Sequence, residues 1–420
     1  MKRSRLQWTA AAVALVTPLL LAACGGGGGG SEGPITVSGT VVNGAGTPVS
    51  GADVVLNGDD ASILTTGADG AFSYAQVKPP YNLTVKSATT VIEFRGLRRA
   101  APQIVTSSEG LSYGATLAGN VTGPTYPLVH QCIWLGASNG VLTTGTTSSG
   151  AYSAGFLWPA GLSTTTDLAA LYGQGDCQNA PTAFYQVGKR TGVTAQNGVG
   201  QVGLDIDLST AVNTRSTVLD YSPGAYSSSP HATYLMVYAG GAHFLLALLQ
   251  STLPSGASVP FPEGGGTFLV AGHDAQGNMA TRIGKAVLGG TTRLDLPTST
   301  ALSNSQPLDG ATVSKTPSLS WTPVSGAALY VVTVEASGLE YRFYLPGDSA
   351  TLSLPDYSAL GLPLAGNTTY TWTALAMKWS GMDPDALTDP AVGGLGLAQL
   401  FQATDLTYYN SQQTSFTTTP

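Results

Sequence analysis

The sequence predicts an all-β protein built from several β-sandwiches in tandem. Only 10% of its 420 residues are charged, and 54 are glycine. An average globular chain has about 25% charged residues and about half as much glycine. Apolar runs are short, many alternate with polar residues, and Gly, Asn, Asp and Pro separate them. This pattern is typical of β-structure outside the cytoplasm.

Residues 1–23 have the layout of a secretory signal peptide. Lys2, Arg3 and Arg5 precede an apolar run from Ala10 to Ala23. The run is shorter than the about 20 apolar residues that a membrane-spanning helix needs. Residues 21–24, Leu-Ala-Ala-Cys, follow at its end and resemble the lipobox of bacterial lipoproteins.

The lipobox resemblance implies that Cys24 becomes the lipidated first residue of the mature chain and anchors it to a membrane. An ordinary signal peptide with an incidental cysteine is the alternative. Residues 24–34 then form a flexible tether, because Gly25 to Gly30 is an unbroken glycine run. In a Gram-negative cell, Gly25 after the acylated cysteine implies outer-membrane or surface localisation, by analogy with other lipoproteins.

The charge balance argues against nucleic acid as a partner. Cleavage before Cys24 would leave 14 of the 17 basic residues against 24 acidic ones, a formal charge of −10. Binding to nucleic acid needs clustered Lys and Arg.

Cys132 and Cys177 are predicted to form a disulfide, since disulfides persist in exported proteins. Two buried free thiols are the alternative.

Residues 35–114 are the first predicted sandwich. Strands are expected at 35–42, 52–57, 62–66 and 81–86, with a tight turn at 69–70. The order G-T-V, G-x-P-V-x-G-A-x-V, D-G-x-F resembles the carboxypeptidase regulatory-like (transthyretin-like) domain. The resemblance implies a seven-stranded sandwich that performs no chemistry, with Val41, Val54 and Phe72 in its core.

Residues 115–208 are predicted to be a degenerate second copy of that sandwich. Gly39-Thr40-Val41 aligns with Gly119-Asn120-Val121, and residues 69–73 align with 149–153 at the same offset. Chance alignment of turn-rich sequence is the alternative.

Residues 209–300 are predicted to be a third sandwich of unknown type. Its strands are expected at 233–239, 243–249, 267–274, 281–288 and 292–296, with a hairpin tip at 274–278.

Residues 301–420 resemble a fibronectin type III domain of the immunoglobulin-like class. Trp321 matches the early-strand tryptophan of that family, Tyr330 the aromatic of the next strand, and Tyr370 its tyrosine corner. Tyr370 and Trp372 are two residues apart, so both are expected to face the core. More than thirty residues, 380–414, separate the last two expected strands, where about 2–5 are usual.

No metal or other cofactor is expected. The four histidines show no paired ligand spacing. The acidic loop 383–389 offers three carboxylates to a calcium ion, but its spacing differs from the well-known calcium loop. The histidines are His130, His231, His243 and His273.

No catalytic residue is expected either. Ser138 lies in a G-x-S-x-G string at 136–140, but strand-like sequence follows it where a nucleophile elbow needs a helix. A hairpin turn is the preferred interpretation. Asp205 and Asp207 alternate with apolar residues, as in a half-solvated strand.

The candidate ligand-contact loop is the 380–414 insertion, because aromatic side chains at a loop tip can stack on sugars or anchor in a partner. The alternative is that these residues fold back as a small core, with a short helix at 395–401. The aromatic residues are Trp379, Phe401, Tyr408 and Tyr409.

Together these features predict a membrane-anchored, exported lipoprotein that acts as a non-catalytic surface adhesion or ligand-presenting protein, with a glycan or protein as its ligand. One alternative is a carbohydrate- or peptide-binding accessory subunit of a separate enzyme. The other is a hydrolase whose site lies in 209–300, with His231 or His243 beside a carboxylate.

Overall fold

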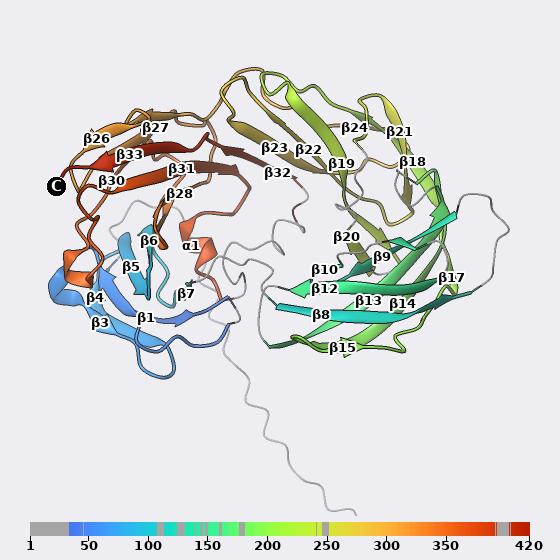
Figure 1. Ribbon diagram of the computed structural model, residues 1–420, viewed down its shortest axis with the longest axis horizontal. Coiled ribbons are helices and arrows are strands. Elements are labelled where there is room, and N and C mark those ends of the chain that lie inside the picture. Colours follow the sequence, from blue (N-terminus) through green and yellow to red (C-terminus); the bar gives the residue numbers. More distant parts are fainter. Residues whose placement is uncertain are drawn as a thin grey trace, which may run out of the picture. The chain divides into compact units, whose positions relative to one another are not determined.

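The computed structural model describes residues 33–420 apart from 45, 107–112, 124–130, 139, 143–145, 148–149, 159–161, 176–180, 241, 246–251, 391, 393–402 and 404. Its regular structure is almost all β-strand, which confirms the predicted fold of tandem β-sandwiches (Figure 1). The described helical elements are α1 (Pro384–Leu387) and two 3-10 turns, η1 (Asp60–Ser62) and η2 (Ser358–Leu360). None of these is long and apolar enough to cross a membrane. The predicted signal peptide, Cys24 and most of the tether lie outside the described residues.

The N-terminal sandwich, residues 35–105, has seven described strands in two layers. One layer has the order β4-β1-β7, and the other has the order β3-β2-β5-β6. Val41, Val54 and Phe72 are all buried, as predicted. The strands are β1 (Ile35–Val42), β2 (Asp53–Leu56), β3 (Leu64–Thr65), β4 (Ala71–Val77), β5 (Tyr81–Ser87), β6 (Thr90–Leu97) and β7 (Gln103–Val105).

The second sandwich, residues 113–211, also has two layers. One contains β10-β12-β8-β15 with β16 beside β8, and the other has the order β11-β9-β13-β14-β17. The strands are β8 (Tyr113–Thr122), β9 (Gln131–Ala137), β10 (Val141–Leu142), β11 (Thr146–Thr147), β12 (Ala151–Trp158), β13 (Ser163–Gln174), β14 (Ala183–Gln196), β15 (Gly200–Gln201), β16 (Ile206–Asp207) and β17 (Thr210–Ala211).

The first two sandwiches share a strand register. Gly39 of β1 pairs with Phe72 of β4, and Gly119 of β8 pairs with Tyr152 of β12, each 80 residues further on. Both positions need glycine because the chain passes close by. A Cβ at Gly39 would lie 2.4 Å from the Pro102 carbonyl oxygen, and one at Gly119 would lie 2.4 Å from that of Leu204. A degenerate repeat would produce this shared register.

The third sandwich, residues 214–293, places β21-β18-β24 in one layer and β20-β19-β22-β23 in the other. The predicted hairpin tip is confirmed, since His273 pairs with Met279 across the turn. The strands are β18 (Thr214–Asp220), β19 (Ser228–Ala239), β20 (Ala242–Leu245), β21 (Ala257–Pro262), β22 (Gly266–His273), β23 (Met279–Lys285) and β24 (Thr291–Arg293).

The C-terminal sandwich, residues 304–418, buries Tyr370 and Trp372, as predicted, and it also buries Trp321 and Tyr330. The Tyr370 hydroxyl accepts a 2.8 Å hydrogen bond from the Ala365 amide, which is the link to the upstream backbone that a tyrosine corner makes. The strands are β25 (Asn304–Gln306), β26 (Ala311–Val313), β27 (Ser318–Trp321), β28 (Leu329–Ala336), β29 (Leu339–Pro346), β30 (Thr351–Ser353), β31 (Thr369–Lys378), β32 (Asp405–Asn410) and β33 (Thr414–Thr418).

One 14-stranded sheet passes through the N-terminal, third and C-terminal sandwiches. Its main path is β20-β19-β22-β23-β32-β31-β28-β29-β6-β5-β2-β3. At one junction β6 pairs with β29 in parallel, from Thr90 opposite Glu340 to Phe94 opposite Tyr344. At the other, β32 lies between β23 and β31. The sequence predicts sandwiches in a row and does not reveal these pairings. The boundaries expected near residues 114, 208 and 300 stay predictions.

The 380–414 insertion supplies both β32 and α1. Its α1 helix is fixed to the N-terminal sandwich, because Asp385 accepts hydrogen bonds from the Arg98 and Arg99 amides at 2.7 and 2.8 Å. The Gln103 amide also donates to the Thr388 carbonyl at 2.8 Å. The insertion therefore connects three sandwiches.

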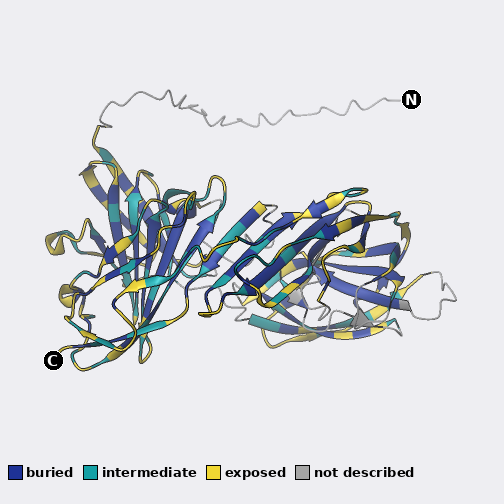
Figure 2. Ribbon diagram, turned by 90° about the horizontal axis from the view of Figure 1, so that it is seen from above, coloured by how far each residue is buried: buried dark blue, intermediate teal, exposed yellow. Residues whose placement is uncertain are grey.

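Buried residues of different sandwiches share core clusters, and Figure 2 colours the buried stretches of the strands dark blue. One core cluster contains Trp134 of the second sandwich, Tyr234 of the third and Trp321 of the C-terminal one. At the β6–β29 junction the rings of Phe94 and Tyr344 stack with centroids 4.4 Å apart. Apolar burial of this kind stabilises the junctions as it stabilises a domain core.

Candidate functional site

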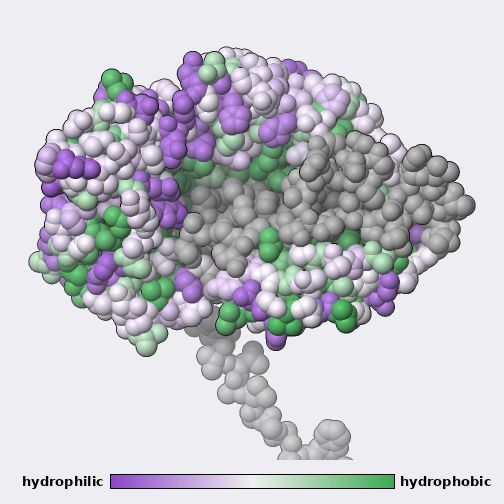
Figure 3. Space-filling model, viewed as in Figure 1, coloured by the Kyte–Doolittle hydropathy of each residue, from purple (hydrophilic) through white to green (hydrophobic). Residues whose placement is uncertain are grey.

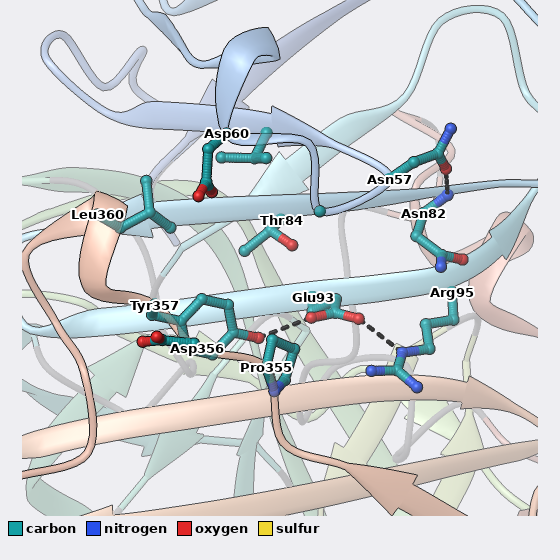
Figure 4. A pocket seen from close by; sticks show the side chains of 12 residues that line it. Asn57, Asp60, Asn82, Thr84, Glu93, Arg95, Pro355, Asp356, Tyr357 and Leu360 are labelled. Carbon is teal, nitrogen blue, oxygen red and sulfur yellow. Dashed lines mark hydrogen bonds and ion pairs between the residues drawn. The ribbon is translucent and has the colours of Figure 1, made fainter. Parts of the chain in front are cut away.

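A pocket of about 270 Å³ lies between the N-terminal and C-terminal sandwiches (Figure 4). Its floor is formed by buried side chains and its rim by exposed polar ones. One wall comes from β2, β5, β6 and the turn after β2, and the other from residues 355–360, which follow β30. The lining residues are Val55, Asn57, Gly58, Asp60, Asn82, Thr84, Glu93, Arg95, Pro355, Asp356, Tyr357 and Leu360.

The alternation of β6 places two charged side chains in the pocket. Alternate residues of a strand share a face, so Glu93 and Arg95 lie on one side. Ile92 and Phe94 lie on the other side, in the core cluster of the N-terminal sandwich. Because β6 pairs with both β5 and β29, Glu93 is held in the interior of the sheet.

Glu93 is a buried carboxylate whose two oxygens both accept hydrogen bonds. It is only 4% exposed. The Arg95 Nε donates to its Oε1 at 2.6 Å, and the Tyr357 hydroxyl donates to its Oε2 at 2.6 Å. Figure 4 shows Tyr357 and Arg95 on opposite sides of this carboxylate. A buried charge is tolerated when it is paired and hydrogen-bonded in this way.

Tyr357 remains a hydrogen-bond donor over the whole physiological pH range. Burial, and then the neighbouring Glu93 carboxylate, raise the pKa of Tyr357 well above its usual value. Its ring also stacks on Tyr341, with centroids 5.8 Å apart. The Tyr357–Glu93–Arg95 chain is therefore a fixed, charge-balanced floor.

Two asparagines at the pocket have their amides oriented by the backbone. Asn57 Oδ1 accepts from the Asn82 amide at 2.8 Å, and Asn82 Oδ1 accepts from the Gly96 amide at 3.1 Å. Since each oxygen is used, each Nδ2 group is left to donate elsewhere. Asn57 has a positive φ of 54°, a conformation that asparagine tolerates better than most residues.

This geometry suits binding. Both oxygens of the buried carboxylate already accept strong hydrogen bonds, so Glu93 acts as a structural anchor, while the side chains around it offer hydrogen bonds to a guest. Among the described residues, no group of three or more His, Cys, Asp or Glu could hold a metal ion.

Sequence reasoning missed this site. The run at 90–97, Thr-Val-Ile-Glu-Phe-Arg-Gly-Leu, carries one signal that could have found it: a carboxylate inside an otherwise apolar strand, with an arginine two residues on. A buried charge demands a partner. The partner Tyr357 is 264 residues away in sequence, so only the fold identifies it.

The predicted ligand-contact residues lie in a different place. Tyr408 and Tyr409 belong to β32, inside the large sheet, and Tyr409 is 3% exposed. Trp379 and Tyr408 are half-buried and pack against the core cluster that contains Ile283 and Leu406. Phe401 lies outside the described residues. A ligand-contact role for these four aromatics stays a prediction.

The predicted disulfide also stays a prediction. Cys132 is fully buried in β9. Its expected partner Cys177 lies outside the described residues, as does the predicted lipidation site Cys24.

The G-x-S-x-G serine does not lie at a nucleophile elbow. Ser138 follows β9 and precedes β10, so strands flank it as predicted. The hairpin interpretation is wrong, because β9 and β10 belong to different sheets and the segment crosses between them. The Ser138 hydroxyl accepts a 3.0 Å hydrogen bond from the Asp167 amide.

The acidic loop 383–389 uses its carboxylates to hold the chain together. Asp383 caps α1 by accepting from the Ala386 amide at 2.7 Å. Asp385 binds the Arg98 and Arg99 amides, and Asp389 pairs with the Arg99 guanidinium at 2.9 Å. These contacts explain the local cluster of acids without a cation.

The remaining catalytic and metal-site candidates are two aspartates and four histidines. Asp205 and Asp207 are exposed and flank buried Ile206, as alternation predicts. His231 is exposed on β19, and His273 ends β22. His130 and the side chain of His243 lie outside the described residues.

Fold and pocket define the chain as a multi-sandwich β-protein with a pocket lined by polar and apolar side chains. No protein-family profile matches the sequence, and no curated protein does. Among solved structures, the chain is similar to the major pilin subunit BcpA of Bacillus cereus, at 8% identity and a TM-score of 0.14, over 63% of this chain and 98% of the pilin. It is also similar to the FN1–FN3 domains of chicken CNTN1, at 9% identity and a TM-score of 0.14, over 70% of this chain and 88% of that one.

Proposed function

We propose that this protein is an exported lipoprotein, anchored through Cys24, that presents a ligand-binding surface and performs no catalysis itself. The observation that carries the proposal is the pocket between the N-terminal and C-terminal sandwiches, which offers hydrogen bonds around an already satisfied carboxylate. Preformed polar groups in a concave site are typical of ligand recognition.

The shared sheet supports the same role. Because β6 pairs with β29, the two sandwiches that supply the walls of the pocket are joined by backbone hydrogen bonds. A ligand then meets a site that is already assembled, and less ordering entropy opposes binding. A tether at 24–34 would hold this assembly away from the membrane.

The surface composition also fits a protein displayed outside the cell. In the view of Figure 3, pale, weakly polar residues cover much of the surface between smaller purple and green groups. Clustered Lys and Arg, which nucleic-acid binding requires, are not expected at a formal charge of −10 for the chain from Cys24.

Metabolic labelling with an alkyne fatty acid tests the anchor. The wild-type chain should be labelled, and Cys24→Ser should lose the label and remain unprocessed. Cys132→Ser is the matched control, because it removes a cysteine that the proposal assigns to a disulfide, and it should stay labelled. Label on Cys24→Ser, or a mature N-terminus at another residue, would refute lipid anchoring. Protease treatment of intact cells then tests display, since only an exposed chain is cut.

The pocket also favours a second role, as a carbohydrate- or peptide-binding subunit of a separate enzyme. Crosslinking in the native cell distinguishes the two. Recovery of one stoichiometric hydrolase favours the accessory subunit, and its absence favours independent display.

A further inference from the structure

We propose that the pocket beside Glu93 binds one neutral sugar residue, as the end or a branch of a glycan. This inference names the ligand class for the ligand-presenting role proposed above. It depends on three features of the pocket, which are the hydrogen-bonding groups left unused, their mixture of donors and acceptors, and the size of the cavity.

Several groups at the pocket have hydrogen-bonding capacity to spare. Thr84 is 4% exposed and lines the pocket, and its hydroxyl has no hydrogen-bond partner among the described residues. The Nδ2 groups of Asn57 and Asn82 likewise have no described partner, although the oxygen of each amide is bound. These groups face the pocket with bonding capacity left over, so a guest with matching polar atoms can form hydrogen bonds to them.

Acceptors lie among these donors. Asp60 is exposed at the rim, and its carboxylate accepts no hydrogen bond from a described residue. Asp356 uses Oδ1 to accept from the Ser358 amide at 3.0 Å, which leaves Oδ2. The Arg95 charge is already balanced by Glu93, at 2.6 Å.

This mixture selects the chemical class of the ligand. An ammonium group only donates, so it would satisfy Asp60 and Asp356 but leave Thr84 and the two amides without acceptors. A phosphate or carboxylate only accepts, and it would face the two rim carboxylates. A sugar hydroxyl both donates and accepts. A ring with neighbouring hydroxyls can therefore satisfy donors and acceptors together without adding charge.

The cavity has the size for one ring. Its volume of about 270 Å³ lies just below the about 300–1,000 Å³ that is usual for drug-sized ligands. The apolar floor residues Val55 and Leu360 offer contact to the C–H face of a ring. The open rim at Asn57 and Asp60 leaves room for the rest of a glycan.

The test is binding of single sugars to the full chain, purified in a detergent without a sugar headgroup. Saturation-transfer NMR and calorimetry compare methyl glucoside, methyl galactoside, methyl mannoside and N-acetylglucosamine with cationic glucosamine and anionic glucuronate. At least one neutral sugar should bind, and both charged sugars should bind at least about tenfold more weakly.

Two variants locate the site. Thr84→Val removes the hydroxyl but keeps the shape, and Asn82→Asp replaces the donor while keeping an oxygen for the Gly96 amide. Each should weaken binding of the neutral sugar about tenfold or more. Thr90→Val, on the same sandwich outside the pocket, is the matched control and should bind as the wild type does. Circular dichroism should show all three variants folded.

Two outcomes would overturn the inference. One is the absence of binding by every neutral sugar, and the other is binding that Thr84→Val and Asn82→Asp both leave unchanged. If glucosamine or glucuronate bound at this pocket more strongly than the neutral sugars, the assignment of a neutral sugar as the ligand would be overturned. These assays use purified protein, so they are independent of the labelling that tests the lipid anchor.

Discussion

The Tyr357 hydroxyl donates a 2.6 Å hydrogen bond to the Glu93 carboxylate, joining residues that lie 264 positions apart. Glu93 belongs to the N-terminal sandwich and Tyr357 to the C-terminal one. The bond therefore reinforces the β6–β29 pairing with a buried polar contact. It also fixes the floor of the pocket, because Arg95 bonds to the other carboxylate oxygen.

Tyr357→Phe should destabilise this junction. The substitution leaves one oxygen of a buried carboxylate without a donor, which costs about 1–3 kcal/mol. Urea unfolding should show that loss, and hydrogen exchange should rise in β6 and β29. Tyr408→Phe is the control, since its half-buried hydroxyl has no described hydrogen-bond partner, and it should change neither measurement. Equal effects of the two substitutions would show that the Tyr357–Glu93 hydrogen bond contributes nothing to stability.

Gly39→Ala and Gly119→Ala should each destabilise the protein. The added Cβ would lie 2.4 Å from a backbone carbonyl oxygen at both sites, so the strands must shift. Overpacking of this kind costs about 1–3 kcal/mol. Gly200→Ala is the control, because nothing lies within 4 Å of its added Cβ. Thermal unfolding midpoints should fall for the first two variants and stay near the wild type for the third.

Asp274 should make stability depend on pH. Burial alone would raise the pKa of Asp274, but hydrogen bonds from Asn278, Thr300 and the Gln276 amide outweigh it and lower that pKa. A lowered folded-state pKa adds stability above the unfolded value of about 3.9, and the contribution is lost as pH falls through the folded value. The wild type should thus exceed Asp274→Asn in unfolding free energy at pH 7, and the difference should shrink below about pH 4. A difference independent of pH would contradict this.

Cys132→Ala and Cys177→Ala should have equal effects if the predicted disulfide forms. Losing the bond should cost about 4 kcal/mol in the chain-entropy model, and the double variant should cost no more than either single one. Unfolding with and without reductant measures this, and a peptide map under non-reducing conditions shows the linkage. Additive effects would favour two separate buried thiols.

The local elements could be predicted well from sequence. The run at 35–42 is β1, and the alternation at 204–208 places Leu204, Ile206 and Leu208 in the core. The spacing of Tyr370 and Trp372 put both side chains on the buried face. Such features depend on strand periodicity and turn chemistry, which neighbouring residues encode.

The candidate site could not be predicted in this way. The aromatic residues of the 380–414 insertion suggested a recognition loop, yet Tyr408 and Tyr409 lie in a strand between β23 and β31. A strand edge accepts any backbone of suitable geometry, because pairing uses N–H and C=O groups that every residue except proline carries. The sequence does not mark which distant strand will be chosen.

By itself, the sequence determined that this chain is all-β, where many of its strands run, and that Phe72, Tyr370 and Trp372 face a core. Tertiary structure alone decided that β6 would join β29, that β32 would bridge two sandwiches, and that Glu93 would meet Tyr357. The physical reason is the distance along the sequence over which each kind of interaction acts. Periodicity and turns act over a few residues, whereas sheet pairing and the burial of a charge are settled between segments that meet only when the chain has folded.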